Sequence, residues 1–199
     1  MRLIIADDHV IFREGLKLLL SHAGYTVVAE AGDAGSLREL VREHGPELVI
    51  LDYHMPGNDS AAVLAYLKQR YPELKVIMLT AAQSGTLLKQ LADAGADGVL
   101  LKEGSATLLL DALRRVLAGE RVIAKAATER IKDATVALTA REFQILHLIC
   151  AGESSTAIAE RLTLSPRTVE KHRENLFRKL EVNNVAQLIN KAETLNLLQ

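Results

Sequence analysis

The stretch RLIIADDHVIF (residues 2–12) decides the first half of the fold, because an apolar run passes directly into two adjacent carboxylates. Residues 3–6 are apolar, and such a short run is typical of a buried strand. Asp7 and Asp8 repel each other, and each loses hydration if it lies against a sheet. The pair therefore indicates either a surface turn or a binding site for a cation.

Four more apolar runs follow along the first 120 residues, and segments with helical spacing separate them. The runs are TVVA (26–29), ELVILD (47–52), KVIMLT (75–80) and GVLLK (98–102). The helical segments cover residues 12–22, 36–44, 60–70, 85–94 and 106–117. Continuous apolar runs that alternate with helices are typical of buried parallel strands. The sequence therefore predicts an α/β domain with a five-stranded, parallel, doubly wound sheet of the flavodoxin-like type.

Polar side chains stand where these strands end. Asp7 and Asp8 follow the first strand, Asp52 ends the third, Thr80 ends the fourth and Lys102 follows the fifth. The carboxyl ends of parallel strands meet at one edge of the sheet, so we expect these side chains to lie together. Carboxylates suit Mg²⁺, and a lysine suits a phosphoryl oxygen. A single aspartate at a strand end is usually a turn former, but this set favours a phosphoryl-transfer site with Asp52 as nucleophile.

The motifs ADDH, LDYHMPG, LTA and LLK, in this order and spacing, resemble the receiver domain of bacterial two-component response regulators. The resemblance implies that Asp52 accepts a phosphoryl group from a sensor histidine kinase, with Mg²⁺ as cofactor. The implied metal ligands are Asp7, Asp8, Asp52 and the backbone carbonyl of His54. It also implies that Thr80 and Lys102 bind the phosphoryl group and that Thr80 acts as the switch residue.

Two departures from this family pattern bear on the phosphorylation switch. Val99 stands where the family usually has an aromatic switch residue, and Glu103 stands where many receivers have proline after the lysine. They leave an alternative open, a phosphorylation-independent DNA-binding regulator whose receiver serves as a protein-interaction module. We do not expect an enzyme, because phosphatases with an aspartate nucleophile commonly have a second acid where His54 stands.

The second half of the chain has helical patterns only. We interpret residues 1–120 as the receiver domain, residues 121–136 as a linker that is helical in part, and residues 137–199 as a small all-α domain of four helices. LTAREF carries a capping box formed by Thr139 and Glu142. Ser154 or Ser155 and then Ser165 are the expected N-caps of the next two helices, and a last helix is expected over residues 185–197.

The segment SPRTVEKHRENLFRKLEV (165–182) predicts an amphipathic, basic helix. On a helical wheel its core face consists of Val169, Leu176 and Leu180. Within residues 165–180, five lysines and arginines outnumber the two glutamates, Glu170 and Glu174. Together with the short helix over residues 155–162, it predicts a helix-turn-helix whose exposed face enters the major groove of DNA.

The segment from LTAREF to RKLEV resembles the LuxR-type helix-turn-helix, and its fusion to a receiver resembles the NarL/FixJ family of response regulators. Carried over by position, the implied base-facing residues are Glu170, Lys171 and Glu174. The other implied DNA-binding residues are Thr156, Arg167, Thr168, His172, Arg178 and Lys179. His172 lies on the inner side of the wheel, so packing is an equal alternative for it. The implied dimerisation residues are Leu188, Ile189, Ala192 and Leu195, which would equally suit the core of the small domain.

Composition limits the class of protein. The net charge is −1, 49% of the residues are hydrophobic, and the single cysteine, Cys150, lies in the apolar run ILHLIC. No apolar run approaches the ~20 residues of a membrane helix, and no signal peptide is recognisable. We therefore expect a cytoplasmic regulator of transcription that binds no membrane, is phosphorylated at Asp52 by a kinase, and binds double-stranded DNA as a homodimer when phosphorylated.

Overall fold

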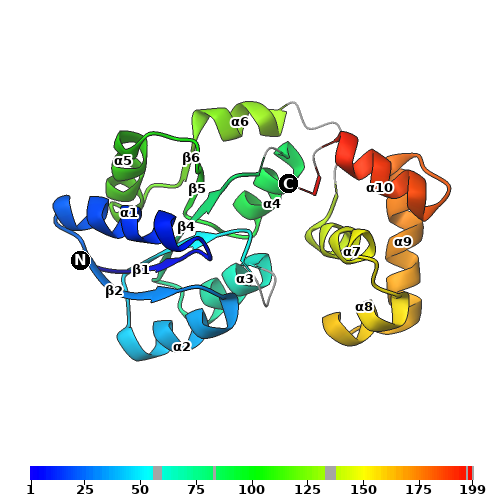
Figure 1. The fold of residues 1–199 in the computed structure, drawn as a ribbon, viewed down its shortest axis with the longest axis horizontal. Coiled ribbons are helices and arrows are strands. Elements are labelled where there is room, and N and C mark those ends of the chain that lie inside the picture. Colours follow the sequence, from blue (N-terminus) through cyan, green and yellow to red (C-terminus); the bar gives the residue numbers. More distant parts are fainter. Residues whose placement is uncertain (56–59, 83, 133–137, 196, 199) are drawn as a thin grey trace. The chain divides into compact units, whose positions relative to one another are not determined.

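A computed structural model of the chain describes residues 1–55, 60–82, 84–132, 138–195 and 197–198 (Figure 1). These residues form two compact units. The first unit consists of residues 1–81 and 91–128, and the second consists of residues 82–90 and 129–199. Among the described residues, no helix is long and apolar enough to cross a membrane.

The first unit is built on a parallel sheet with the strand order β2-β1-β3-β4-β5-β6. Its strands are β1 (Arg2–Ala6), β2 (Thr26–Ala31), β3 (Leu48–Asp52), β4 (Lys75–Thr80), β5 (Gly98–Leu101) and β6 (Val122–Ile123). Every neighbouring pair is parallel, which confirms the predicted parallel, doubly wound sheet. The strand order reverses between β1 and β3, and ligands bind at such a reversal, beyond the carboxyl ends of the strands.

In the part of the chain that the structure describes, the sheet has six strands, whereas the sequence predicts five. β6 pairs with β5 through Gly98↔Val122 and Val99↔Ile123. Two residues are too few to give a recognisable apolar run, so the sequence pattern does not distinguish this strand from the linker. The same segment contains α6 (Lys125–Lys132), whereas residues 133–136 of the predicted linker lie outside the described residues.

Helices cover both faces of the sheet. Their bounds are α1 (Val10–His22), α2 (Ala34–His44), α3 (Ser60–Arg70) and α5 (Ala106–Leu117). α4 (Gly85–Asp93) begins in the second unit and ends in the first. Leu20 of α1 and Leu113 of α5 pack in one cluster with Ile5 and Ile50 of the sheet. α2 and α3 lie on the opposite side of the sheet from α1 and α5 (Figure 1). Strands that are buried on both faces explain the continuous apolar runs of the sequence.

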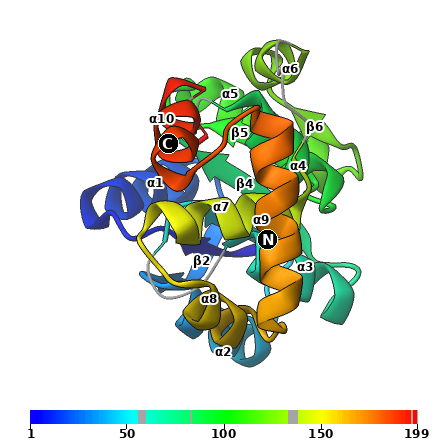
Figure 2. The same ribbon diagram turned by 90° about the vertical axis from the view of Figure 1, so that its right-hand side faces the viewer.

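Four further helices follow among the described residues of the second unit, as predicted for the C-terminal part of the chain. They are α7 (Ala140–Cys150), α8 (Ser155–Leu162), α9 (Pro166–Leu180) and α10 (Val185–Thr194). α7 and α8 both pack against α9, which is seen along its length in Figure 2. Thr139 and Glu142 form the predicted capping box of α7, and α8 and α9 begin after Ser154 and Ser165. α10 ends at Thr194, three residues before the predicted end.

The core of this unit includes the apolar face predicted for α9. Val169, Leu176 and Leu180 are buried, together with Phe143 of α7. Cys150 is half-buried, and burial raises the pKa of its thiol to about 11. Because the thiolate is the reactive form, a raised pKa is typical of an unreactive structural cysteine.

Candidate functional site

The carboxyl ends of the strands bring the predicted polar residues of the first unit to one edge of the sheet. Asp7 directly follows β1, Asp52 and Thr80 end β3 and β4, and Lys102 directly follows β5. Asp7, Asp52 and Thr80 are almost completely buried, whereas Asp8 remains exposed. Buried carboxylates require a compensating charge, so their partners determine what this edge can do.

Lys102 supplies that charge. Its ammonium nitrogen lies 2.7 Å from Oδ2 of Asp7 and 2.8 Å from Oδ2 of Asp52. The ring of Phe12 from α1 lies 4.9 Å from the same nitrogen, in cation–π geometry. The backbone N–H of Lys102 donates to the carbonyl oxygen of Thr80 at 2.8 Å, which joins the ends of β4 and β5. One lysine therefore connects the ends of β1, β3 and β5 and is held against β4.

The electrostatics of this cluster are coupled. Burial raises the pKa of Asp52, and the charge of Asp7 raises it further, while Lys102 opposes both effects. Burial by itself would lower the pKa of Lys102, but its bonds to Asp52 and Asp7 outweigh burial and raise that pKa. The lysine is therefore a cation at neutral pH, and it compensates only part of the charge of two carboxylates.

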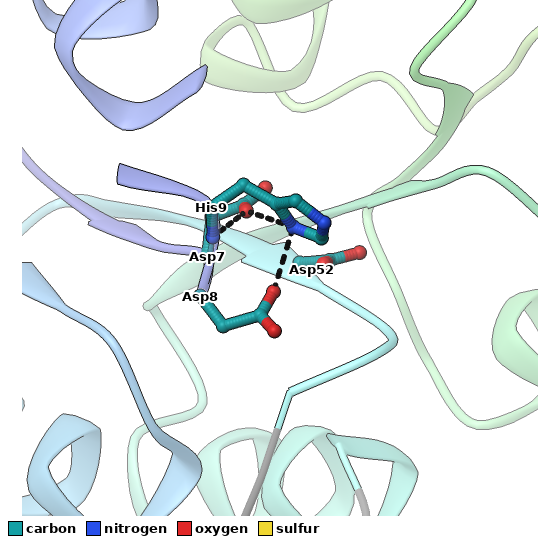
Figure 3. Close-up of side chains that lie close together, drawn as sticks. All are labelled: Asp7, Asp8, His9 and Asp52. Atoms are coloured by element: carbon teal, nitrogen blue, oxygen red, sulfur yellow. Dashed lines mark hydrogen bonds and ion pairs between the residues drawn. The ribbon is translucent and has the colours of Figure 1, made fainter. Parts of the chain in front are cut away.

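One oxygen of Asp52 lacks a partner. Oδ2 accepts from Lys102, but Oδ1 is buried and has no hydrogen-bond partner among the described residues. A buried carboxylate oxygen without a partner is unfavourable, so this atom is expected to receive a ligand. Ligand atoms of Asp7, Asp8, His9 and Asp52 lie within 4.8 Å of one another (Figure 3). The carboxylate oxygens of this group fit a hard divalent cation such as Mg²⁺.

Two further side chains contact this acidic group, and neither was predicted from the sequence. Nδ1 of His9 lies 2.8 Å from Asp8 and 3.2 Å from Asp7. Arg13 of α1 donates to the carbonyl oxygen of Asp7 at 2.5 Å, and its Nε lies 3.6 Å from Glu30 of β2. α1 and β2 together therefore fix the turn that carries the two acids. Such contacts leave no periodic signal in a sequence, although the adjacency of His9 to the acids was visible.

The predicted role of His54 is a ligand role for its backbone carbonyl, and this stays a prediction. Burial lowers the pKa of the His54 imidazole, and its ring meets that of Tyr53 edge to face at 4.7 Å. Residues 56 and 57 of the motif LDYHMPG lie outside the described residues.

The second unit carries the residues predicted to bind DNA. Arg167, Glu170, Lys171, Glu174 and Arg178 are exposed along α9, as is Thr156 in α8. The helical wheel predicted this exposed face correctly. A helix of this kind presents hydrogen-bonding groups to base edges and positive charge to phosphates.

Three of the predicted DNA-binding residues are half-buried, namely Thr168, His172 and Lys179. Thr168 bonds Ser165 at the N-cap of α9, and Lys179 lies 2.7 Å from the buried carboxylate of Glu142. Burial would raise the pKa of Glu142, but Lys179 and the capping bonds of Thr139 outweigh burial and lower it. DNA contacts of Thr168 and Lys179 stay predictions, and in the structure both side chains stabilise the fold of their own unit.

For His172 the sequence leaves packing and DNA contact open, and for the apolar residues at the C-terminal end it leaves the core and a dimer face open. Nδ1 of His172 is buried without a hydrogen-bond partner among the described residues, which favours packing over a phosphate contact. Leu188 and Ala192 are completely buried, and this favours a role in the core of the unit. Ile189 and Leu195 are half-buried, so they remain the stronger candidates for a dimer face.

Comparisons with known proteins assign both halves of the chain to protein families. Residues 3–114 match the response regulator receiver domain, and residues 136–192 match the bacterial regulatory proteins of the luxR family. The probable transcriptional regulatory protein NarL of Mycobacterium tuberculosis is 35% identical and covers 100% of this chain and 96% of its own length. The nitrate/nitrite response regulator protein NarP of Escherichia coli is 33% identical over 92% of this chain and 90% of its own length.

Solved structures of the response regulator RcsB from Salmonella are also similar. One has a TM-score of 0.83 at 28% identity and covers 98% of each chain. Another, RcsB bound to the promoter rprA in the presence of the phosphomimetic BeF3-, has a TM-score of 0.83 at 29% identity, with 98% of this chain and 99% of that chain covered. The receiver match covers more than half of the chain, and the relatives match over nearly their whole length. The chain therefore belongs to the NarL/FixJ family of two-component response regulators, which are DNA-binding transcription regulators with a receiver domain and a LuxR-type helix-turn-helix.

Proposed function

We propose that Asp52 accepts a phosphoryl group from a sensor histidine kinase, and that this step controls dimerisation and promoter binding. The observation that carries the proposal is the asymmetry of the Asp52 carboxylate. Lys102 holds Oδ2, while Oδ1 is buried and has no partner among the described residues. This arrangement leaves one oxygen for bond formation and fixes the other.

The transfer follows from this geometry. Oδ1 of Asp52 attacks the phosphorus of a phosphohistidine on the kinase, so that a P–O bond forms and the P–N bond breaks. The leaving imidazole nitrogen keeps the electron pair of that bond. Lys102 is placed to stabilise an oxygen of the transferred group, because its charge already lies at Asp52. Asp7, Asp8, Asp52 and the carbonyl of His54 would hold Mg²⁺, which supplies neutralisation of phosphoryl charge.

Phosphorylation changes the charge of the site and therefore the hydrogen bonds that Lys102 and Thr80 can form. A phosphoryl group brings further negative charge and new hydrogen-bond acceptors to Asp52. Lys102 then has a competing partner, and Thr80 contributes its hydroxyl as a donor. Lys102 and Thr80 are joined through their backbones, so a change at one is transmitted to the ends of both β4 and β5. A shift of population toward a dimeric, DNA-binding form is the proposed consequence.

Features of the second unit support the DNA-binding half of the proposal. Of the five basic residues of α9, Arg173 and Lys179 contact acidic groups of their own unit. Fewer cations remain for phosphates, so a single copy is expected to bind DNA weakly and a dimer on two half-sites more tightly. One solved structure of the similar protein RcsB contains two dimers bound to two parallel DNAs, which is consistent with this expectation.

The test uses the full chain with acetyl phosphate and Mg²⁺. Phos-tag electrophoresis should show one retarded species in the wild type and none in Asp52→Asn. Sedimentation velocity should show a larger dimer fraction for the retarded species only. A phosphorylated wild type that sediments as the unphosphorylated protein does would contradict the proposal and favour the receiver as a phosphorylation-independent interaction module.

A further inference from the structure

Glu170, on the exposed face of α9, is held by two neighbouring side chains. The hydroxyl of Ser155, the first residue of α8, donates to Oε1 of Glu170. Arg173 donates to the same hydroxyl at 3.2 Å, and its Nε lies 3.7 Å from Oε2 of Glu170. We call Ser155, Glu170 and Arg173 the Glu170 clamp. It spans α8 and α9 and fixes a carboxylate that would otherwise rotate freely.

The hydroxyl of Ser155 is not needed to begin α8. Ser154 is the N-cap, and its side chain accepts from the backbone N–H of Ala157. Ser155 follows the cap, and its hydroxyl connects Arg173 to Glu170. The position of this side chain is therefore better explained by what it does for Glu170 than by helix initiation.

The clamp leaves acceptor capacity in the carboxylate of Glu170. A carboxylate has about four lone-pair positions, and the hydroxyl of Ser155 uses one of them. The side chain of Glu170 is 56% exposed, whereas that of Arg173 is 20% exposed. The guanidinium therefore compensates the negative charge from within the unit and reduces its repulsion of DNA phosphates. The remaining lone-pair positions of Glu170 are open to solvent.

We propose that the clamp sets the Glu170 carboxylate to accept a hydrogen bond from the exocyclic amine of a cytosine in the major groove. Carboxylates pair with cytosine in this way, and a side chain that is already ordered loses less entropy on binding. Glu170 is then a specificity-determining residue, and Ser155 and Arg173 are positioning residues. The inference rests on the proposed role of α9 as the recognition helix. It adds that cytosine is the base that Glu170 recognises, and that Ser155 and Arg173 hold the Glu170 side chain in place.

The experiment selects bound duplexes from a pool of random double-stranded DNA, with the full chain in beryllofluoride and Mg²⁺. The base preference at each position is obtained by sequencing for the wild type, Glu170→Gln, Ser155→Ala, Ser155→Thr and Glu160→Gln. The wild type should prefer cytosine at one position of each half-site. Glu170→Gln should lower that preference about fivefold or more and favour adenine, because glutamine pairs with adenine. Ser155→Ala should lower it about threefold at the same position.

Two variants separate positioning from a general structural role. Ser155→Thr keeps the hydroxyl and should restore the cytosine preference. Glu160→Gln changes an exposed side chain of α8 that lies outside the clamp and outside the predicted DNA-binding residues, so it should leave every base preference unchanged. Thermal unfolding of each variant establishes that the unit remains folded, and affinity for a random-sequence duplex measures the part of binding that does not depend on sequence.

The outcomes distinguish this inference from the proposed function. A base preference that does not respond to Glu170→Gln would overturn the readout by Glu170. A response to Glu170→Gln without one to Ser155→Ala would overturn the positioning role. A wild type that selects no site would overturn both the inference and the DNA-binding role of α9. A site selected equally with and without beryllofluoride would overturn phosphorylation control alone, and the Glu170 clamp would still be tested.

Discussion

The two charged regions of this chain are organised in opposite ways. At the strand edge, Asp7 and Asp52 are buried and share one lysine, so each charge depends on the others. On α9, Arg167, Lys171 and Arg178 are exposed along one face of the helix. Groups in one network give large, non-additive effects when one is changed, whereas exposed charges act nearly independently and are screened by salt. This difference predicts which substitutions abolish a function and which only weaken it.

The largest effect is expected from Asp8→Ala at the strand edge. Asp8 is exposed and lies in the acidic group that fits Mg²⁺, so its loss should slow phosphorylation about 100-fold or more without unfolding the chain. The initial rate of the Phos-tag shift with acetyl phosphate, at saturating Mg²⁺ for the wild type, measures this. Asp111→Ala, an exposed acid on α5, is the matched control and should be phosphorylated at the wild-type rate. Equal rates for Asp8→Ala and the control would contradict a role of Asp8 in Mg²⁺ binding and favour its interpretation as a turn residue.

Lys102→Met is expected to destabilise the first unit strongly. It leaves two buried carboxylates without a cation, and breaking such a pair costs about 3–5 kcal/mol. Urea denaturation in the absence of divalent cations measures the loss, and Lys171→Met on the exposed face of α9 is the control, with an expected change within about 0.5 kcal/mol. Similar losses in the free energy of unfolding for the two variants would contradict the conclusion that Lys102 compensates the buried charges of Asp7 and Asp52.

The same variant has a defined dependence on pH. The pKa of Asp52 is raised in the folded wild type, so its ionisation reduces stability as pH rises through that range. Without Lys102 the opposing effect is lost and the pKa of Asp52 rises further. The destabilisation of Lys102→Met should therefore be smallest near about pH 4 and grow toward neutral pH. A penalty that shrinks as pH rises would contradict this assignment.

Glu142→Gln tests a buried and paired charge of the second unit. Loss of the ion pair with Lys179 should cost about 1 kcal/mol at neutral pH, because glutamine keeps the capping bond. The folded pKa of Glu142 is lowered, so its contribution is complete above its unfolded pKa, which lies near 4.5, and is lost as pH falls through the folded value. Urea denaturation curves of the full chain should therefore converge in acid. Glu160→Gln, on the exposed side of α8, should match the wild type throughout.

The smallest effects are expected from the exposed cations of α9. Arg167→Ala should lower DNA affinity a few-fold and reduce the slope of log K against log salt by about 0.9, as for one lost phosphate contact. Lys179→Ala should change that slope less, because its ammonium group bonds Glu142 in the structure. Fluorescence anisotropy titrations at several salt concentrations measure both slopes. Equal changes in slope would show that Lys179 leaves Glu142 to contact DNA.

The strand edge and the exposed face of α9 also differ in how they could be predicted from the sequence. Asp52, Thr80 and Lys102 could be placed together because each stands at the end of an apolar run, and parallel strands end at one edge. β6 could not be predicted, because two residues carry no periodic signal. The exposed face of α9 was predicted because helical periodicity assigns a face to each residue. The periodicity does not show which side chains bond one another across the fold.

The tertiary pairs of the second unit illustrate this limit. Glu142 and Lys179 lie 37 residues apart in sequence, and Ser155 and Glu170 lie 15 residues apart. Neither separation carries a local signal, because both pairs depend on how α7 and α8 pack against α9. The sequence predicted the charge of α9 correctly but not how much of that charge is used inside the unit.

The measurement that tests the central claim most directly is the affinity of the full chain for a selected DNA site, before and after addition of beryllofluoride with Mg²⁺. Fluorescence anisotropy should show tighter binding on addition for the wild type, about tenfold for a coupling of about 1.4 kcal/mol. Asp52→Asn should bind equally in both conditions. An equal affinity of the wild type in both conditions, with beryllofluoride bound, would contradict phosphorylation control and leave a constitutive DNA-binding regulator.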